Sequence, residues 1–237
     1  MLFSVCLPSR AQDTLVADLS RHLVAITTGF AGTDVLLFGA TDGAPADVVA
    51  VVRGPARREV VRRKARTGGI WINVTHTNFD NVPAFYRVAA TRPLSQIASQ
   101  AVLARQQIGL DTLEMPIHNK DSETSDLAYR RALIRLKQDH GHFSEKVQPI
   151  AVLDGRLFRV EVHLPPNVPV GLYSVEIYLF RQGEVVNAQT TPLNVSKIGV
   201  GADVYEFAHR QAALYGIIAI ALAASAGWLA SVAFRRS

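Results

Sequence analysis

Cysteine and methionine are almost absent from the sequence. Cys6 is the one cysteine among 237 residues, and Met1 and Met115 are the two methionines. A single cysteine cannot form an intrachain disulfide or a CxxC site for a metal or a redox reaction. Two methionines, of which one starts the chain, are too few for a copper site built on thioether ligands. The cysteine-based sites are therefore excluded, and a thioether copper site is poorly supported.

The motifs that mark common enzyme classes are also missing. The sequence contains no GxSxG segment, no HExxH segment and no phosphate-binding loop, so it lacks the signatures of serine hydrolases, zinc proteases and P-loop nucleotidases. No nucleic-acid-binding motif occurs either. We therefore expect a protein that is not an enzyme, that needs no cofactor and that has no nucleic-acid partner. An enzyme of an unfamiliar type is the remaining alternative.

One long segment near the C-terminus has no charge at all. Residues 214–234 read LYGIIAIALAASAGWLASVAF, 21 residues in succession. As an α-helix at about 1.5 Å per residue this segment is about 30 Å long, which matches the hydrocarbon core of a bilayer. We therefore predict a single transmembrane helix over 214–234, with the lipid bilayer as a partner. A core or interfacial helix is the alternative.

The charges beside this segment predict its orientation. Arg235 and Arg236 lie in the short tail 235–237, and His209 and Arg210 give a weaker positive charge on the other side. The positive-inside rule then places the C-terminus in the cytoplasm and the bulk of the chain outside.

A domain on the outside must be exported. Residues 1–12 include a short apolar stretch and, at Ser9–Gln12, a resemblance to a small-residue cleavage site. We interpret them as the remnant of a signal peptide. A short disordered N-terminus is the alternative.

The residues that follow carry mostly β-strand patterns, and the predicted fold class is mainly β. Apolar residues alternate with polar ones, or form short runs bounded by Gly, Pro and Asp. Short strands at about ten-residue spacing over residues 13–92 predict an immunoglobulin-like antiparallel β-sandwich. The strands are Leu15–Leu19, His22–Thr27, Asp34–Gly39, Val48–Arg53, Glu59–Lys64, Ile70–Thr75 and Tyr86–Thr91.

The middle of the chain has a helical pattern instead. Within residues 93–145, the segments Leu94–Ile108 and Glu123–His140 place apolar residues three and four apart, which predicts two inserted helices. Period two returns over residues 146–200, which we expect to complete the first sandwich or to form a small second one. Residues 201–213 are the predicted juxtamembrane segment. The later strands are Phe158–Leu164, Val170–Phe180 and Glu184–Val195.

Several short motifs occur together, and on them the chain resembles the alphaproteobacterial putative transmembrane protein family from about residue 14 to the end. The resemblance implies an exported protein with one C-terminal helix in the bacterial inner membrane and the bulk of the chain in the periplasm. The resemblance gives no catalytic role that could be transferred to residues of this chain. The motifs are Arg53-Gly54-Pro55, Val61-Arg62-Arg63-Lys64, Gly69-Ile70-Trp71-Ile72-Asn73, Asn81-Val82-Pro83, Thr91-Arg92-Pro93-Leu94, Leu164-Pro165, Tyr178-Leu179-Phe180 and Gly227-Trp228-Leu229-Ala230.

Basic residues are concentrated in and around one predicted strand. Between Arg53 and Arg66 the only acid is Glu59. Such a cluster could attract a small anion, an acidic protein or phospholipid head groups. It could equally be a solvated edge strand whose charges discourage pairing with other sheets. The candidate interaction surface consists of Arg57, Arg58, Arg62, Arg63, Lys64 and Arg66.

Histidines and aromatic residues give weaker candidates. His140 and His142 are the one close pair among 7 histidines, but Gly141 between them marks a helix end, so their rings need not converge on a metal. We predict no metal site. An aromatic group is expected to pack one end of the sandwich rather than to form a ligand platform, and its members are Trp71, Phe79, Phe85 and Tyr86.

The predicted transmembrane helix has a row of small residues. Ala219, Ala223 and Gly227 recur every four residues, as they do where a second helix approaches closely. We take them as a candidate helix-contact face. Together with the folded outside part, this face favours a non-enzymatic accessory or assembly partner of another integral membrane protein. A tethered periplasmic module that binds a small anion or a metal is the alternative.

Overall fold

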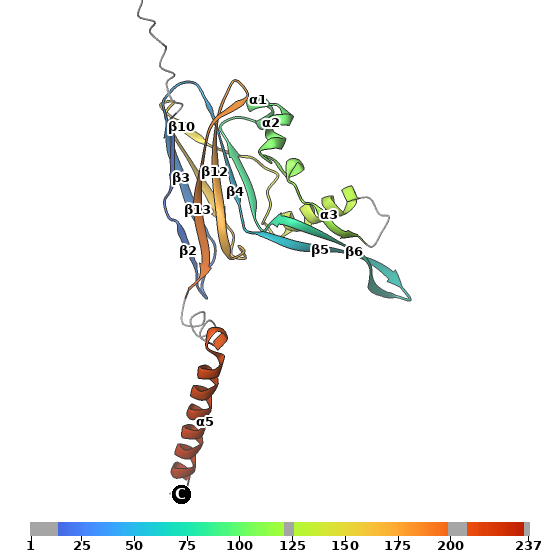
Figure 1. Ribbon diagram of the computed structural model, residues 1–237, viewed down its shortest axis with the longest axis vertical. Coiled ribbons are helices and arrows are strands. Elements are labelled where there is room, and N and C mark those ends of the chain that lie inside the picture. Colours follow the sequence, from blue (N-terminus) through green and yellow to red (C-terminus); the bar gives the residue numbers. More distant parts are fainter. Residues whose placement is uncertain (1–13, 121–125, 199–207, 235–237) are drawn as a thin grey trace, which may run out of the picture. The chain divides into compact units, whose positions relative to one another are not determined.

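The computed structural model describes residues 14–120, 126–198 and 208–234 (Figure 1). The chain divides into two compact units. The first runs to Val195 without residues 25–29 and contains most of the β-structure, and the second combines residues 25–29 with the residues from Ser196 onward.

One antiparallel sheet consists of four short strands in the order β1-β3-β11-β10. Alternation is clear in β1 and β11, where every second side chain is buried, because one face of the sheet meets the core and the other meets solvent. The strands are β1 (Leu15–Leu19), β3 (Thr33–Thr41), β10 (Ala151–Leu153) and β11 (Leu157–Leu164).

A second sheet has six strands in the order β2-β13-β12-β4-β7-β9. The pairs β13–β12, β12–β4 and β4–β7 are antiparallel, and β7 and β9 pair in parallel. The strands are β2 (Leu23–Ile26), β4 (Asp47–Arg53), β7 (Tyr86–Ala90), β9 (Gln148–Pro149), β12 (Gly171–Arg181) and β13 (Glu184–Lys197).

These two sheets are joined by side chains and by the chain itself. Gln189 on β13 donates to the carbonyl of Ala17 on β1 at 2.6 Å and accepts from its N–H at 2.9 Å. Strands that follow the helical segment pair with strands that precede it, since β11 lies beside β3 and β12 beside β4. The strands on both sides of the helical segment therefore share the same sheets.

The six-stranded sheet is covered on its other face by the helical segment. Val48 to Val52 on β4 are all at most 3% exposed, so this strand is buried on both faces, and its run of valines reflects that burial. Val49 and Val51 share one core cluster with Leu103 and Leu133 of the helical segment. The helices are α1 (Leu94–Ile97), α2 (Gln100–Arg105), the 3-10 turn η1 (Leu110–Thr112) and α3 (Asp126–Asp139).

A third, three-stranded sheet contains the longest hairpin of the described chain. It has the order β5-β6-β8, with strands β5 (Ala56–Thr67), β6 (Ile70–Pro83) and β8 (Ile117–Lys120). β5 is therefore an edge strand. The turn at Gly68 and Gly69 has φ of +58° and +87°, as a two-residue type I′ hairpin requires. The hairpin projects away from the two larger sheets (Figure 1).

The second unit contains helix α5 (Ala212–Phe234). Its segment Ala212–Ser231 is the one helix in the described residues that is long and apolar enough to cross a membrane, and none of its apolar window is buried by protein. This length and composition match the predicted transmembrane segment.

The predicted mainly β fold with antiparallel sheets, inserted helices and one apolar C-terminal helix is confirmed, while its immunoglobulin-like character stays a prediction. The expected single helix over residues 94–108 is wrong, because Ala98 is extended and the Ser99 side chain accepts from the Val102 N–H to start a separate helix. The predicted signal remnant 1–12 lies outside the described residues, as do 121–125, most of the juxtamembrane segment and the tail 235–237.

Candidate functional site

The base of the β5–β6 hairpin, residues 56–61 and 75–83, is fixed to the rest of its unit. Phe79 is 1% exposed and belongs to the same core cluster as Tyr129 of α3. Lys137 of α3 donates to the Glu59 carboxylate at 2.5 Å, and the hydroxyls of Thr75 and Tyr129 lie 2.6 Å apart. The base is therefore a structural part of the core.

Two residues of the predicted basic surface form hydrogen bonds in the base of the hairpin. Arg57 donates to the carbonyl of Val170 at 2.8 Å, and Arg58 donates to the Asp80 carboxylate at 2.7 Å. Arg57 therefore attaches the hairpin to a neighbouring segment, and Arg58 joins the two strands of the hairpin.

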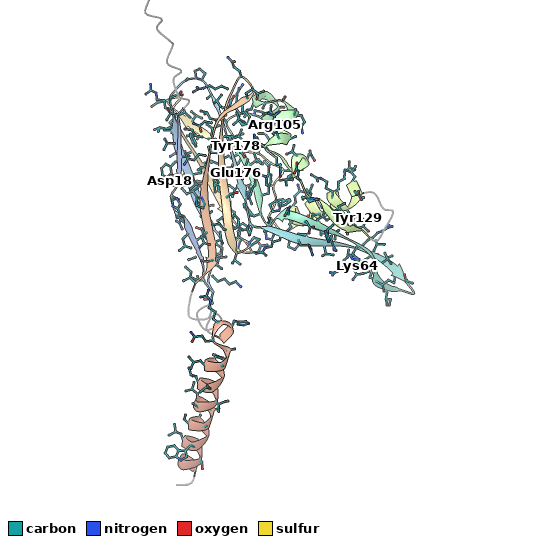
Figure 2. The ribbon with its side chains drawn as sticks, in the orientation of Figure 1. Asp18, Lys64, Arg105, Tyr129, Glu176 and Tyr178 are labelled. Carbon is teal, nitrogen blue, oxygen red and sulfur yellow. The ribbon has the colours of Figure 1, made fainter. Side chains whose placement is uncertain are left out.

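The arm, defined as residues 62–74, is different. It carries four cations and no acid. The side chains of Arg62, Arg63 and Lys64 have no hydrogen bond or ion pair with any described residue, while the Arg66 side chain donates weakly across the turn to the Gly69 carbonyl at 3.4 Å. Figure 2 shows Lys64 on the projecting hairpin. The arm therefore has a concentration of positive charge that no acidic side chain among the described residues pairs with.

Apolar side chains are exposed on the same arm. Trp71 is 68% exposed and Ile70 is 66% exposed, and Ile72 and Val74 are also exposed. The expected packing of Trp71 with Phe79, Phe85 and Tyr86 is wrong, since those three are buried. The physical reason is that Trp71 lies opposite Arg66, next to the turn, beyond the part of the hairpin that packs on α3. The apolar run directly after the turn does not by itself reveal this exposure, because it depends on where the core ends along the hairpin.

The register distributes these residues over two faces. Residues opposite each other in an antiparallel pair point to the same face, and every second residue along a strand does so too. The pairs Arg66↔Trp71 and Lys64↔Asn73 therefore share one face with Arg62. The pairs Ala65↔Ile72 and Thr67↔Ile70 form the other. One face of the arm carries three cations with Trp71 at its end, and the opposite face carries Ile70 and Ile72 together with one cation, Arg63.

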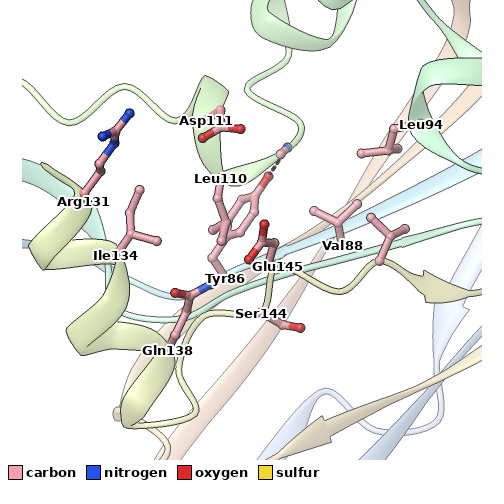
Figure 3. Close-up of a pocket in the computed structure, with 12 residues that line it drawn as sticks. Tyr86, Val88, Leu94, Leu110, Asp111, Arg131, Ile134, Gln138, Ser144 and Glu145 are labelled. Carbon is pink, nitrogen blue, oxygen red and sulfur yellow. Dashed lines mark hydrogen bonds between the residues drawn. The ribbon is translucent and has the colours of Figure 1, made fainter. Parts of the chain in front are cut away.

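A cavity of about 360 Å³ lies between β7 and the helical segment (Figure 3). Its apolar lining includes Leu110 and Ile134, and its charged lining residues are Asp111, Arg131 and Glu145. A cavity of this size could hold a small molecule.

The hydroxyl of Tyr86, in the wall of this cavity, has both an acceptor and a donor partner in the protein. Its hydroxyl donates to the Gln107 carbonyl at 2.9 Å and accepts from the Gly109 N–H at 2.8 Å. Burial raises the pKa of Tyr86 to about 12, so the hydroxyl stays protonated at neutral pH. The residue therefore holds the 107–109 loop in place and is not suited to accept a proton from a ligand.

An ion pair between β4 and β12 also holds the chain next to the 107–109 loop. Arg53 on β4 donates to the Glu176 carboxylate on β12 at 3.1 Å and to the Gln106 carbonyl at 2.8 Å. The hydroxyls of Tyr178 and Ser174 donate to the same carboxylate at 2.7 and 3.0 Å. Burial and the adjacent carboxylate raise the pKa of Tyr178 to about 12. The raised pKa of Tyr178 thus has a structural explanation.

The histidine pair lies at the end of α3. The rings of His140 and His142 are stacked with their centres 5.9 Å apart. Nδ1 of His140 bonds to the Leu136 carbonyl at 2.6 Å, and Nε2 of His142 bonds to the Asn167 carbonyl at 3.1 Å. In the described part of the chain, no group of three or more His, Cys, Asp or Glu residues could hold a metal ion.

The predicted helix-contact face lies on α5. Ala219, Ala223 and Gly227 are all exposed in the structure. A Cβ atom added at Gly227 would meet nothing within 4 Å. The second unit thus leaves this face open to whatever surrounds the helix.

The comparisons with known proteins agree with this helix. A family model described as "Putative transmembrane protein (Alph_Pro_TM)" matches residues 14–236. The chain belongs to this family. Neither the curated proteins nor the solved structures give a match. The family and α5 together support a membrane protein, and α5 is the one helix among the described residues that is long and apolar enough to span a bilayer.

Proposed function

We propose that this family member is a non-enzymatic accessory or assembly partner of another integral membrane protein. In this proposal α5 crosses the inner membrane, the β-sheet unit lies in the periplasm and the C-terminus lies in the cytoplasm. The positive charge of Arg235 and Arg236 directly after the apolar run supports this orientation.

The observation that carries the proposal is the open surface of α5. No part of its apolar window is buried by protein, and Ala219, Ala223 and Gly227 follow one another at four-residue intervals along it. Small residues at this spacing let two helix backbones approach closely, which favours helix association in lipid. A folded domain tethered by such a helix is suited to remain beside a membrane partner.

The test is a pull-down of the full-length protein from its native membrane in mild detergent, followed by mass spectrometry. The wild type should recover one integral membrane protein in stoichiometric amount, and the double variant Ala223→Leu, Gly227→Leu should lose it. The matched control is Ala221→Leu, Ser225→Leu, which adds similar bulk on the opposite side of the helix at 100° per residue. Recovery of the bait alone, or equal loss with both variants, would refute the proposed contact.

The cavity favours a second candidate, a binding module. Arg131 provides one cation while Asp111 and Glu145 provide carboxylates, so the lining suits a small polar molecule better than an inorganic anion. A thermal-shift screen of the full-length protein against amino acids, inorganic phosphate and divalent metals tests it, with Arg131→Gln as the variant. A ligand that raises the Tm of the wild type and not of the variant would support this candidate, and a screen without such a ligand would contradict it.

A further inference from the structure

We propose that the arm, residues 62–74, docks on the anionic phospholipid surface of a bilayer. Its cations would contact phosphate groups, and Ile70, Trp71 and Ile72 would enter the boundary between head groups and acyl chains. The inference does not depend on the accessory role, because it requires lipid alone.

The arm has the composition of a segment that binds an anionic membrane surface. The arm carries Arg62, Arg63, Lys64 and Arg66 without any acid, so its surface is complementary to a negative one. A membrane surface that contains anionic lipids attracts such segments by about 1 kcal/mol for each Lys or Arg close to it. Tryptophan is enriched at the membrane interface, where its amphipathic ring sits at the level of the head groups.

Edge protection explains only part of this composition. β5 is an edge strand, and basic side chains on an edge discourage pairing with another sheet. A protected edge does not require exposed apolar residues, however, and Trp71 and Ile70 are each about two-thirds exposed, at 68% and 66%. Exposed apolar residues on both faces of one hairpin end indicate an interaction surface there.

The spacing along the arm fits the thickness of the head-group region. Trp71 lies opposite Arg66, so Lys64 and Arg62 lie two and four residues behind it on the same face. At about 3.4 Å per residue these are steps of about 7 and 14 Å. Each head-group layer is about 5 to 8 Å thick, from the difference between the whole bilayer and its core. With Trp71 at the hydrocarbon boundary, Lys64 would lie at the outer limit of the head-group layer, and Arg62 would lie in water within about 10 Å of it, where its charge is still attracted.

A bilayer is also always available to this chain. α5 is long and apolar enough to span one, and a covalent tether gives the rest of the chain a high effective concentration at that surface. An acidic protein could also attract the cations. The tether and the exposed tryptophan favour lipid over such a protein.

The sequence offers a direct spectroscopic probe. Trp71 and Trp228 are the two tryptophans, so Trp228→Phe leaves Trp71 as the sole emitter. The full-length variant is placed in nanodiscs of phosphatidylcholine alone or with phosphatidylglycerol, and its fluorescence is recorded with and without brominated lipids. We expect emission at shorter wavelength, and quenching by the brominated lipids, in the anionic discs only. High salt should reverse both.

The charge variant is Arg62→Gln, Lys64→Gln in the same background. Loss of two cations should lower the equilibrium constant for docking about 30-fold, or about 2 kcal/mol at 1.4 kcal/mol per tenfold. Its matched control is Lys146→Gln, Arg159→Gln, which removes two exposed cations outside the hairpin. Because all four side chains are exposed, the variants should keep the Tm of the parent.

Three results would overturn the proposal. Trp71 could emit as a water-exposed residue in both kinds of disc. It could be shielded equally in both, with no response to salt or to the charge variant. It could also become shielded only when membrane proteins from a native extract are added, which would identify a protein partner instead of lipid. None of these results bears on the pull-down with the α5 variants, so the two proposals fail separately.

Discussion

The base and the arm of the β5–β6 hairpin belong to the same two strands and differ in their surroundings. In the base, Phe79 is buried and Glu59 is paired with Lys137. In the arm, Trp71 is exposed, and Lys64 has no ion-pair partner among the described residues. Side chains of the base thus stabilise the fold, whereas those of the arm contribute little to it. The arm's residues are therefore better explained by a contact outside their unit.

The largest expected effect is the loss of a buried side chain in the base. Phe79→Ala would leave a cavity among β5, β6 and α3, at a cost of about 3–5 kcal/mol in unfolding free energy. For a chain of this size that lowers Tm by about 10 °C. Thermal unfolding of the full-length protein in detergent, followed by near-ultraviolet circular dichroism, measures it. A drop of only a degree or two would show that the base is not part of the core.

The next largest effect concerns the ion pair that holds the loop after α2. Glu176→Gln removes the charge that Arg53 and two hydroxyls contact, at a cost of about 2 kcal/mol. Since Arg53 also holds the Gln106 carbonyl, we expect faster tryptic cleavage after Arg105. The control is Glu184→Gln, an exposed carboxylate in β13. Equal cleavage rates for Glu176→Gln and the control would contradict this role.

A smaller effect should appear in acid. Arg92 beside Asp47 lowers the pKa of this carboxyl below its usual 3.8, so the folded state favours the ionised form. This stability is present above about pH 4 and is lost as the pH falls through the lowered pKa. Asp47→Asn should therefore reduce the unfolding free energy at pH 7 and flatten its decline below about pH 4. The arm contains no carboxylate, so the charge variant of the arm should retain that decline.

The smallest effect on stability is expected at the arm. Trp71→Ala should change the unfolding free energy by less than about 0.5 kcal/mol, as exposed substitutions usually do, while it weakens docking to anionic nanodiscs. The same thermal unfolding measurement provides the comparison with Phe79→Ala. A large destabilisation by Trp71→Ala would remove the distinction between base and arm.

Much of the fold could be predicted because local patterns determine it. The alternation in Leu15–Leu19 predicts β1 with its observed bounds. The two glycines at 68 and 69 predict the hairpin turn, and the uncharged run 214–234 predicts α5. In each case the pattern lies within one element, and no distant residue is needed to interpret it.

The remainder depends on contacts between distant residues. The continuation of β6 through Thr77 to Pro83 was not predictable, because Thr77, Asn78 and Phe79 pair with the distant strand β8. Arg53 and Glu176 are 123 positions apart, so no local pattern joins them.

The candidate surface was predictable only in part. The basic run was visible in the sequence, but which cations are paired and which are free depends on Asp80 and Val170. The exposure of Trp71 follows from where the core ends along the hairpin, and composition does not reveal that.

Hydrogen–deuterium exchange of the full-length protein in nanodiscs, with and without phosphatidylglycerol, tests the distinction between base and arm most directly. Exchange is read for the arm, residues 62–74, and for the base, residues 56–61 and 75–83, in the same sample. Anionic lipid should slow exchange in the arm and leave the base unchanged. Equal exchange of the arm in both kinds of disc would contradict the proposed docking of the arm on anionic lipid.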